Sequence, residues 1–539
     1  GATLTNVRPG GVSVLSTSQP NLPPKFKVVG GYLHGPHVDL SGANLALLDF
    51  STQANAINWS SANLTNATFT GMKSGWIEID SDASGPTLTG PYVYNRRVET
   101  NPSGGFIIGP SVNLTGANFT NFDLSNVLDV SNVNFTNAIF TNVKTSGAIA
   151  TPTAGNFPTF SAGSGYVLYG GFIVGPSVDM SGTNVAGFVF GTSAAAVSAG
   201  STSALSGANF TNANMSTANL FGSTVNGTIF TGANFLRTRT GGLSYTTTIP
   251  AMPDATTYKY IVTTSSGGYI IGPGVDLAQT NLQGANFTGV NFNNVIMGEA
   301  SISNTSSENI IYDASSALPT GYTFITNSAN SSFIMGPNLN FTSKTLNGAT
   351  IRDVDITGTI FTNASFTSVK SSGITFTPGT PPVFTAGSGY GINAGFLVGP
   401  SVDLSGASMS GVDLSGENLT SAVFVNADLS GANLYATTLS YATFSGASFI
   451  NIRSGGRINF VSQPTLPSAS YRLISNGYAE AVPNSGFQRY IVGPDANCRG
   501  ADFSGAVFDR VDLSGVDFTG ANFTNAGSGI MRNVPLLAT

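Results

Sequence analysis

The chain has few charged residues, one cysteine and two histidines. Asp, Glu, Lys and Arg make up 9% of its 539 residues, against about 25% in an ordinary soluble domain. Because Lys, Glu and Arg fill the outer faces of helices, this scarcity nearly excludes long surface helices. Cys498 has no second cysteine for an internal disulfide, and two histidines leave little for metal or acid–base chemistry. We therefore expect no enzyme, no catalytic residues, no cofactor and no metal.

Two further absences exclude particular classes of function. No run of about 18 apolar residues occurs, so we expect no segment that spans a membrane. The net charge of −6 has the wrong sign for a nucleic-acid binder, and 26 acidic residues are too few for a protein that mimics DNA. The chain nevertheless contains 66 Gly and 36 Phe, and 41% of it is hydrophobic. So much apolar material argues against disorder and predicts a buried core.

A large apolar residue recurs at every fifth position in seven blocks. Each block follows a Gly-Pro pair, and the seven prolines are Pro36, Pro110, Pro176, Pro273, Pro337, Pro400 and Pro494. The repeat starts four positions after each proline, at Leu40, Leu114, Met180, Leu277, Phe341, Leu404 and Cys498. The longest run without a gap is Leu404, Met409, Leu414, Leu419, Phe424, Leu429, Leu434, Leu439, Phe444 and Phe449. A second run continues from Cys498 through Phe503, Phe508, Leu513, Phe518 and Phe523.

A period of five matches neither the 3.6-residue period of a helix nor the two-residue period of a strand. We interpret it as a coil with one corner per five residues, in which the large residue and the small residue two positions earlier point inward. The Gly or Asn that follows many large residues, as in Ser405-Gly406, suits a tight corner. Successive coils would stack like parallel strands, roughly 4.8 Å apart. The predicted core comprises Leu40, Leu114, Met180, Leu277, Phe341, Leu404, Leu414, Leu429, Leu434, Cys498, Phe503 and Phe518.

Triplets such as Ala432-Asn433-Leu434, Ala117-Asn118-Phe119 and Ala501-Asp502-Phe503 resemble the repeated motif of the pentapeptide-repeat proteins. The resemblance covers about half of the chain and implies an all-β fold, a right-handed four-sided β-helix. Its multi-block form with a Gly-Pro opening resembles sequences from aquatic microbes and large viruses. Three departures predict outward bulges. Glu417 stands at a normally small, inward position, the register slips by one residue between Leu124 and Val130, and the repeat is interrupted from Phe190 to Leu205.

Segments between the blocks break the period and carry Pro-rich turns followed by aromatic stretches. We interpret each as a short β-rich linker that packs on one solenoid block and opens the next. The predicted divisions are a closing step of a block at 1–11 and seven modules at 12–75, 76–147, 148–242, 243–308, 309–373, 374–456 and 457–539.

A basic residue stands four positions after the last large residue of most blocks: Lys73, Lys144, Arg239, Lys370 and Arg453. It is either a solvated cation or a cap for free carbonyl groups of the block's last coil. Residues 1–11 align with residues 446–456, and Leu4 and Arg8 keep the same four-residue offset. We therefore expect the chain to start inside the last step of a block, as a processed product or a fragment.

Other candidate sites have ordinary explanations. His34 and His37 lie near Asp39, but the equivalent positions of the other blocks hold no histidine, so a substituted turn is favoured over a zinc site, which needs three or four ligands. Asn-x-Ser/Thr triplets such as Asn63-Leu64-Thr65 arise from the repeat itself, although glycosylation of an extracellular product stays open. Isolated outward carboxylates are weak evidence for calcium. Cys498 is expected to be a buried, inert thiol.

Three function classes compete. The first is an extracellular or virion-surface fibre, a head-to-tail homopolymer whose assembly interface comprises Leu4, Arg8, Phe523 and Ile530. The second is an adhesin that displays loops toward a glycan or host receptor. The third follows from the resemblance, because some pentapeptide-repeat proteins mimic DNA and inhibit topoisomerases, but the few carboxylates argue against it. An ice-binding surface would need regular Thr columns, whereas Ser, Thr, Asp, Ala and Val mix at the outward positions. The fibre is favoured.

Two substitutions test the inward register. Leu429→Asp places an unpaired charge inside a dry coil and should lower the unfolding free energy by more than about 4 kcal/mol. Asn433→Ser changes an outward side chain and should alter it by no more than about 0.5 kcal/mol. Thermal unfolding of the two variants measures the difference, and equal shifts in melting temperature would refute the register.

Overall fold

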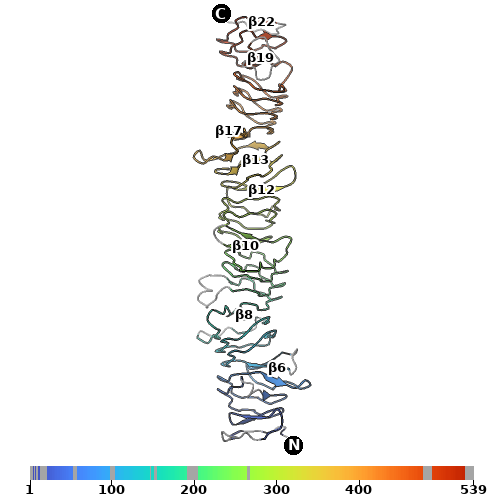
Figure 1. Cartoon of the computed structure of the whole chain (residues 1–539), viewed down its shortest axis with the longest axis vertical. Helices are drawn as coiled ribbons and strands as arrows, with labels where there is room; N and C mark the ends of the chain where they lie inside the picture. Colours follow the sequence, from blue (N-terminus) through green and yellow to red (C-terminus); the bar gives the residue numbers. More distant parts are fainter. Residues whose placement is uncertain are drawn as a thin grey trace.

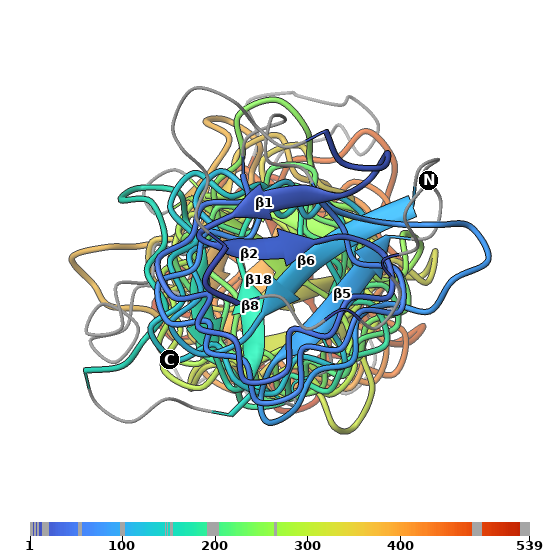
Figure 2. The same ribbon diagram turned by 90° about the horizontal axis from the view of Figure 1, so that it is seen from below.

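The protein is a long rod built from one β-solenoid. The computed structural model describes residues 4, 7, 10–12, 21–51, 57–97, 103–145, 147, 149–150, 155–190, 204–263, 267–476 and 488–528. Within these residues the fold is all-β and has no helix. The chain climbs the rod in sequence order, so that the blue and red ends in Figure 1 lie at opposite ends of the long axis. Seen along that axis, the coils superimpose around one centre (Figure 2).

Each coil of the solenoid has four sides of five residues. In the sixth block, Asp403 pairs in parallel with Val423 and Val423 pairs with Thr443, so that equivalent positions recur after four repeats. The Leu404 N–H donates to the carbonyl of Val423 at 2.7 Å, and the Val423 N–H donates to the carbonyl of Val402 at 2.9 Å. The backbone groups of one coil are therefore paired with the coils before and after it, as in a parallel sheet.

The corners are tight turns with one residue in the left-handed region. The Ala407 N–H donates to the carbonyl of Leu404 at 3.1 Å, and Gly406 between them has φ 68°. A type II turn requires a positive φ at this position, which favours Gly and then Asn. Asn426, with φ 57°, occupies the same position one coil later. The Gly and Asn residues predicted to form corners do form them.

The Asp or Asn before each large residue has a structural role that the sequence analysis missed. The side-chain Oδ1 of Asp403 accepts a hydrogen bond from the Ser405 N–H at 3.0 Å, which fixes the corner. Asn433 accepts from the Tyr435 N–H at 3.1 Å and donates its amide to Asp413 of the preceding coil at 2.9 Å. Because Asn433→Ser removes these contacts, we expect it to lower the unfolding free energy by about 1 kcal/mol, which is more than the sequence alone predicts. The large gap to Leu429→Asp remains.

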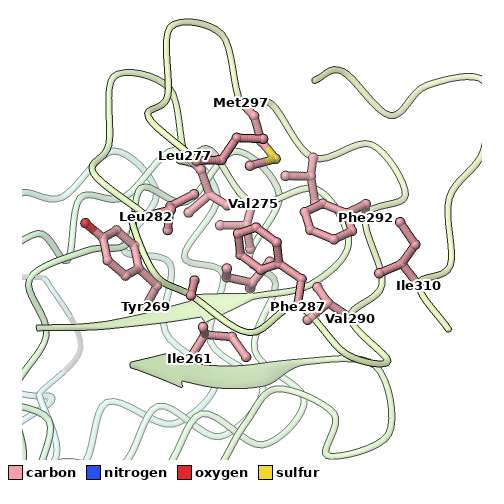
Figure 3. Packing of buried hydrophobic residues seen from close by; sticks show 14 of the residues in the cluster. Ile261, Tyr269, Val275, Leu277, Leu282, Phe287, Val290, Phe292, Met297 and Ile310 are labelled. Atoms are coloured by element: carbon pink, nitrogen blue, oxygen red, sulfur yellow. The ribbon is translucent and has the colours of Figure 1, made fainter. Parts of the chain in front are cut away.

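The core is a column of apolar side chains along the axis. The predicted residues Leu40, Leu114, Met180, Leu277, Phe341, Leu404, Leu414, Leu429, Leu434, Cys498 and Phe503 are at most 2% exposed. Phe518 differs, because it is only half-buried in the last described coil. Stacked rings repeat at the coil spacing, as in Phe424 and Phe444, whose centroids lie 4.9 Å apart at 11°. Figure 3 shows part of this core in the fourth block, where the side chains of Leu277, Leu282, Phe287 and Phe292 point into the interior of the solenoid.

The segments between blocks are β-rich, and each also completes one coil. After Arg453 the chain places Asn459 beside Thr438 and Thr465 beside Thr443, two further sides of the square. A β-hairpin then occupies the third side, and Asn497 pairs with Arg453 on the fourth. The same succession joins the other consecutive blocks, for example through Thr375, Val383 and Asp403 in the fifth junction. Hydrogen bonding along the rod therefore continues across the junctions.

Seven antiparallel hairpins open the seven blocks. Their strands are β1 (Lys27–Val29) with β2 (Tyr32–His34), β5 (Val93–Arg97) with β6 (Ser103–Ile108), β7 (Val167–Tyr169) with β8 (Phe172–Val174), β9 (Lys259–Val262) with β10 (Gly268–Ile271), β11 (Thr323–Thr326) with β12 (Ser332–Met335), β17 (Gly391–Asn393) with β18 (Phe396–Val398), and β19 (Arg472–Ser475) with β20 (Arg489–Val492). The second strand of each hairpin carries the buried aliphatic residues before Gly-Pro. The first strand covers it from outside.

The remaining strands belong to the parallel ladders. They are β3 (Ile57–Asn58), β4 (Ile77–Ile79), β13 (Thr350–Arg352), β14 (Ile360–Phe361), β15 (Lys370–Ser372), β16 (Val383–Phe384), β21 (Val507–Phe508) and β22 (Gly527–Ser528). Strand β4 also pairs with β6, which makes one four-stranded sheet in the order β3-β4-β6-β5.

Successive blocks start on opposite sides of the square. In the sixth block Asp403 lies on the first side and Asp413 on the third. Asn433 and Arg453 continue the column of Asp413, and the first residue of the next ladder, Asn497, stacks on Arg453. The next block thus begins two sides away from where this one began. Each hairpin consequently enters the solenoid on the side of the square opposite the side where the preceding hairpin enters.

Two of the three predicted bulges lie in the described residues, with different outcomes. At Glu417 the coil does not bulge: its N–H donates to the carbonyl of Leu414 at 3.2 Å and its carbonyl accepts from Thr438 at 2.9 Å. The side chain is half-buried, and burial raises the pKa of its carboxyl group, while a hydrogen bond with Asn393 offsets this in part. At the register slip the extra residue turns Leu128 outward, where it is 56% exposed, and leaves Val127 and Val130 buried. Residues 191–203 lie outside the described residues.

An aromatic ring covers the glycine of each of the seven Gly-Pro pairs that open a block. At Gly336 a Cβ atom would lie 2.2 Å from Cδ1 of Tyr322, so only glycine leaves room for the ring. The hydroxyl of Tyr322 donates to the carbonyl of Pro337 at 3.1 Å, and Tyr258 and Tyr471 do the same with Pro273 and Pro494. The seven ring–glycine pairs are Phe26–Gly35, Tyr92–Gly109, Tyr166–Gly175, Tyr258–Gly272, Tyr322–Gly336, Tyr390–Gly399 and Tyr471–Gly493. We call this contact between the ring and the glycine the clasp, and it holds each hairpin on its block.

The clasp predicts a position-specific effect of added methyl groups. Gly336→Ala should lower the unfolding free energy by about 1–3 kcal/mol, because the ring of Tyr322 must move away. Gly298→Ala is the matched control, since a Cβ there meets no atom within 4 Å and its φ is ordinary. Differential scanning calorimetry compares the two, and an equal response would show that the ring does not require glycine.

Candidate functional site: the junctions and the ends of the solenoid

A buried hydroxyl group docks five of the seven hairpins on the preceding coil, whereas the buried hydroxyl of Thr145, before the third hairpin, has no hydrogen-bond partner among the described residues. Ser371 accepts from the Leu397 N–H at 2.8 Å, and Ser454 accepts from the Ile491 N–H at 2.8 Å. Ser74 and Ser307 hold Ile107 and Ile334 in the same way, and Thr240 donates to the carbonyl of Ile270. The sequence analysis missed these residues. A signal was present for four of them, because Ser74, Thr240, Ser371 and Ser454 directly follow a basic residue at a block end, whereas Ser307 follows Ser306.

The basic residues at the block ends lie within the stack, beside carboxylates of adjacent coils. Lys73 Nζ lies 3.6 Å from Asp49 Oδ2, and Lys370 Nζ lies 3.4 Å from Asp403 Oδ2. Arg239 reaches the carbonyl of Ala278, at 3.5 Å. Burial alone would raise the pKa of the Asp403 carboxyl group, but hydrogen bonds from Ser405 and the charge of Lys370 hold it below its ordinary value. The coils that carry these cations are not ends, since the next block covers them, so Lys73 and Lys370 do not cap a free coil. Their side chains are 32% and 51% exposed, which agrees in part with the interpretation as solvated cations.

The first described residues occupy the position of a block's closing step. The Val7 carbonyl accepts from the Asp39 N–H at 3.0 Å, as the Ile452 carbonyl accepts from Asn497 at 2.9 Å. Leu4 is half-buried there. This arrangement agrees with the alignment of residues 1–11 on 446–456. Arg8 lies outside the described residues.

Half-buried aromatic rings lie in the last described coil. Phe523 stacks on Phe503 with centroids 5.5 Å apart, and Phe518 lies 5.1 Å from Phe523. Both Phe518 and Phe523 are less buried than the rings further down the column. Leu4 and Phe523, two of the four predicted assembly residues, thus belong to the first and last described parts of the chain, and the two chain ends lie at opposite ends of the axis (Figure 1). Ile530 lies outside the described residues.

The candidate polar residues are placed apart from one another. His34 is buried in β2, whereas His37 is exposed in the following turn. The Oδ1 of Asp39 accepts from the Ser41 N–H and from the Asn63 amide, each at 3.0 Å. Within the described residues no group of three His, Cys, Asp or Glu side chains could hold a metal ion. No helix in the described part of the chain has the length and hydropathy that a membrane span requires.

The remaining reactive groups are occupied or buried. Asn63 of the Asn-x-Thr triplet accepts from both the N–H and the hydroxyl of Thr65, so the repeat itself uses its side chain. Cys498 is 2% exposed, and burial raises the pKa of its thiol to about 12. A surface hollow of about 760 Å³ is lined by residues 155 and 157–168, which include no ionisable residue except Tyr166. This hollow offers no nucleophile–base pair.

Comparison with known protein families gives one match, to the pentapeptide repeats. It comprises 8 copies at residues 111–142, 203–235, 274–306, 401–434, 418–452 and 495–526. These stretches lie in the second, third, fourth, sixth and seventh blocks. No curated protein matches the chain.

Among solved structures, two matches illustrate what this chain is similar to. The pentapeptide-repeat protein HetL, involved in heterocyst differentiation regulation in the cyanobacterium Nostoc sp. strain PCC 7120, is 11% identical, with 77% of this chain and 88% of HetL covered and a TM-score of 0.11. QnrB1, a plasmid-mediated fluoroquinolone resistance protein, is 13% identical, with 64% of this chain and 92% of QnrB1 covered and a TM-score of 0.10. The ladder, the buried column and the matched repeats together identify the chain as a pentapeptide-repeat protein with the right-handed quadrilateral β-helix fold.

Proposed function

We propose that this protein is a structural rod that stacks head to tail into an extracellular or virion-surface fibre and catalyses no reaction. The observation that supports this most strongly is the unbroken backbone ladder, which passes through the junctions between blocks. A flexible array of separate modules would not need the clasp or the buried hydroxyl groups. A continuous ladder resists bending because every coil is hydrogen-bonded to its neighbours.

The ends of the rod suit stacking of a second copy. A terminal coil presents backbone N–H and C=O groups that can pair with another chain unless a cap covers them. Phe518 and Phe523 add half-buried apolar surface at one end, and Leu4 adds it at the other. Such a contact joins two different surfaces, so it propagates into a filament and does not close into a dimer. With a net charge of −6 over 539 residues, little electrostatic repulsion opposes the contact.

A substitution at the end tests the stacking surface. Phe523→Asp should prevent filaments, because it places a carboxylate in the contact. Val461→Asp is the matched control, since Val461 is 70% exposed and lies along the side of the rod, away from both ends. Negative-stain electron microscopy and sedimentation velocity over a range of concentrations measure filament length. Circular dichroism establishes that the remaining coils of each variant stay folded.

Deletion of residues 1–11 tests the opposite end and should also abolish filaments. If intact protein remains monomeric at high concentration, or if both the deletion and Phe523→Asp variants still polymerise, head-to-tail stacking is wrong. Antibody labelling of intact cells or virions tests the location, and signal only after lysis would contradict an exposed fibre.

A second candidate function, an adhesin, is favoured by the unequal hairpin connections. Gly30-Gly31 and Gly170-Gly171 join strands β1–β2 and β7–β8 directly, whereas β11 and β12 are joined by residues 327–331 and β19 and β20 by residues 476–488. A constant frame with variable loops is typical of scaffolds that display binding surfaces. Replacing residues 327–331 by Gly-Gly should then remove binding on a glycan array while filaments persist. Unchanged glycan binding, or none by the intact protein, contradicts this role for that loop.

A further inference from the structure

His34 lies inside an aromatic cage at the first hairpin. It is fully buried, and its ring centroid lies 5.2 Å from that of Phe50 and 5.7 Å from that of Trp59. Tyr32 on the same strand lies 6.5 Å away. Phe50 and Trp59 lie on the third and fourth sides of the first coil, so the cage joins β2 to two sides of this coil.

The same position is apolar in every other block. Its equivalents, all buried, are Ile108, Val174, Ile271, Met335, Val398 and Val492. The hairpin frame therefore packs well without a polar group here. The fold does not require a histidine at this place, and the first is the only one of the seven described hairpins that has an ionisable side chain at this core position.

The cage accommodates the neutral ring and not the imidazolium ion. Nε2 lies 3.1 Å from the Val29 carbonyl, so the neutral ring donates its single proton there. Nδ1 has no protein hydrogen-bond partner, and neither has Nε1 of Trp59 in the same cage. A proton on Nδ1 would therefore be buried without an acceptor among the described residues, which is costly.

The charged groups around the cage do not compensate for a cation. Lys27, opposite His34 in the β1–β2 register, has the same sign of charge as an imidazolium ion. On the neighbouring coils Asp49 lies beside Lys73, and Asp80 accepts from Lys25 and from Asn58. No ion pair joins His34 to a carboxylate in the described part of the chain.

We infer that His34 is an acid-sensitive latch, and that its protonation opens the β1–β2 hairpin and the adjoining end of the solenoid. The hairpin holds that end in place, because the Gly31 carbonyl accepts from Val12 and Asp39, just beyond β2, donates to Val7. Opening would remove the surface on which a second copy stacks, and this consequence rests on the proposed fibre.

The direction of the effect follows from the two protonation equilibria. Burial lowers the pKa of His34 from 6.5 to about 4, and the hydrogen bond to Val29 offsets this only in part. In an opened hairpin, His34 binds a proton once the pH falls below its ordinary pKa of 6.5. In the closed hairpin, His34 binds a proton only when the pH falls to about 4. The stability of the closed hairpin is thus complete above pH 6.5 and falls as the pH drops toward 4. The opening constant should rise roughly tenfold per pH unit in that window.

Hydrogen exchange on the full chain tests the latch. Amide protection in residues 27–34 and 57–64, corrected for intrinsic exchange rates, should fall between pH 7 and pH 4.5 in the wild type. His34→Ile, which installs the residue of the second and fourth blocks, should keep this protection constant. His37→Ser is the matched control and should behave as the wild type, because His37 is exposed and its equivalents include Ser111 and Ser177.

Three results would overturn the latch: constant protection in the wild type, the same loss in His34→Ile, or a wild-type His34 imidazole NMR signal that titrates near pH 6.5. His34→Val, the residue of three other blocks, provides a second test should the isoleucine disturb packing. Electron microscopy at pH 7 and pH 4.5 separates the latch from the fibre. Loss of protection without filaments at either pH supports the latch and contradicts the fibre, whereas filaments with constant protection do the reverse.

Discussion

Backbone pairing between successive coils is the constraint on which the rest of this structure depends. A four-sided coil of pentapeptides presents its N–H and C=O groups along the axis, and each must meet a partner in the coil before or after it. The position of Leu404 under Phe424, and of Phe424 under Phe444, follows from this register. One inserted residue displaces a side chain from the core to the surface, as Leu128 illustrates.

The junctions between blocks solve the problem that this constraint creates. Any segment that leaves the five-residue period must return in register, or the ladder ends. Here the segment itself supplies two sides of the square and a hairpin supplies a third. The ring of Tyr322 on Gly336 and the hydroxyl of Ser371 under Leu397 fix the hairpin at its two ends. The junction therefore adds a surface loop without interrupting the rod.

The chemistry of the chain agrees with a mechanical role. Its polar side chains largely serve the fold: Asp403 fixes a corner, Asn433 links two coils, and Lys370 balances a carboxylate. The two regions that do not follow this rule are the ends, where apolar rings are half-buried, and the cage of His34, where a titratable ring replaces an aliphatic one.

The sequence by itself determined the repeat, the inward positions and the corners, because a five-residue period is a local property that recurs several times within each block. Residues such as Leu414 and Gly406 could be assigned from spacing alone. The sequence did not determine how blocks join, since the pairing of Asn497 with Arg453 links residues separated by an aperiodic segment. Only the tertiary structure showed that this segment closes a coil, that Gly336 is needed to admit a ring, and that each block starts opposite the preceding one. These features depend on contacts between distant residues, and no local period encodes them.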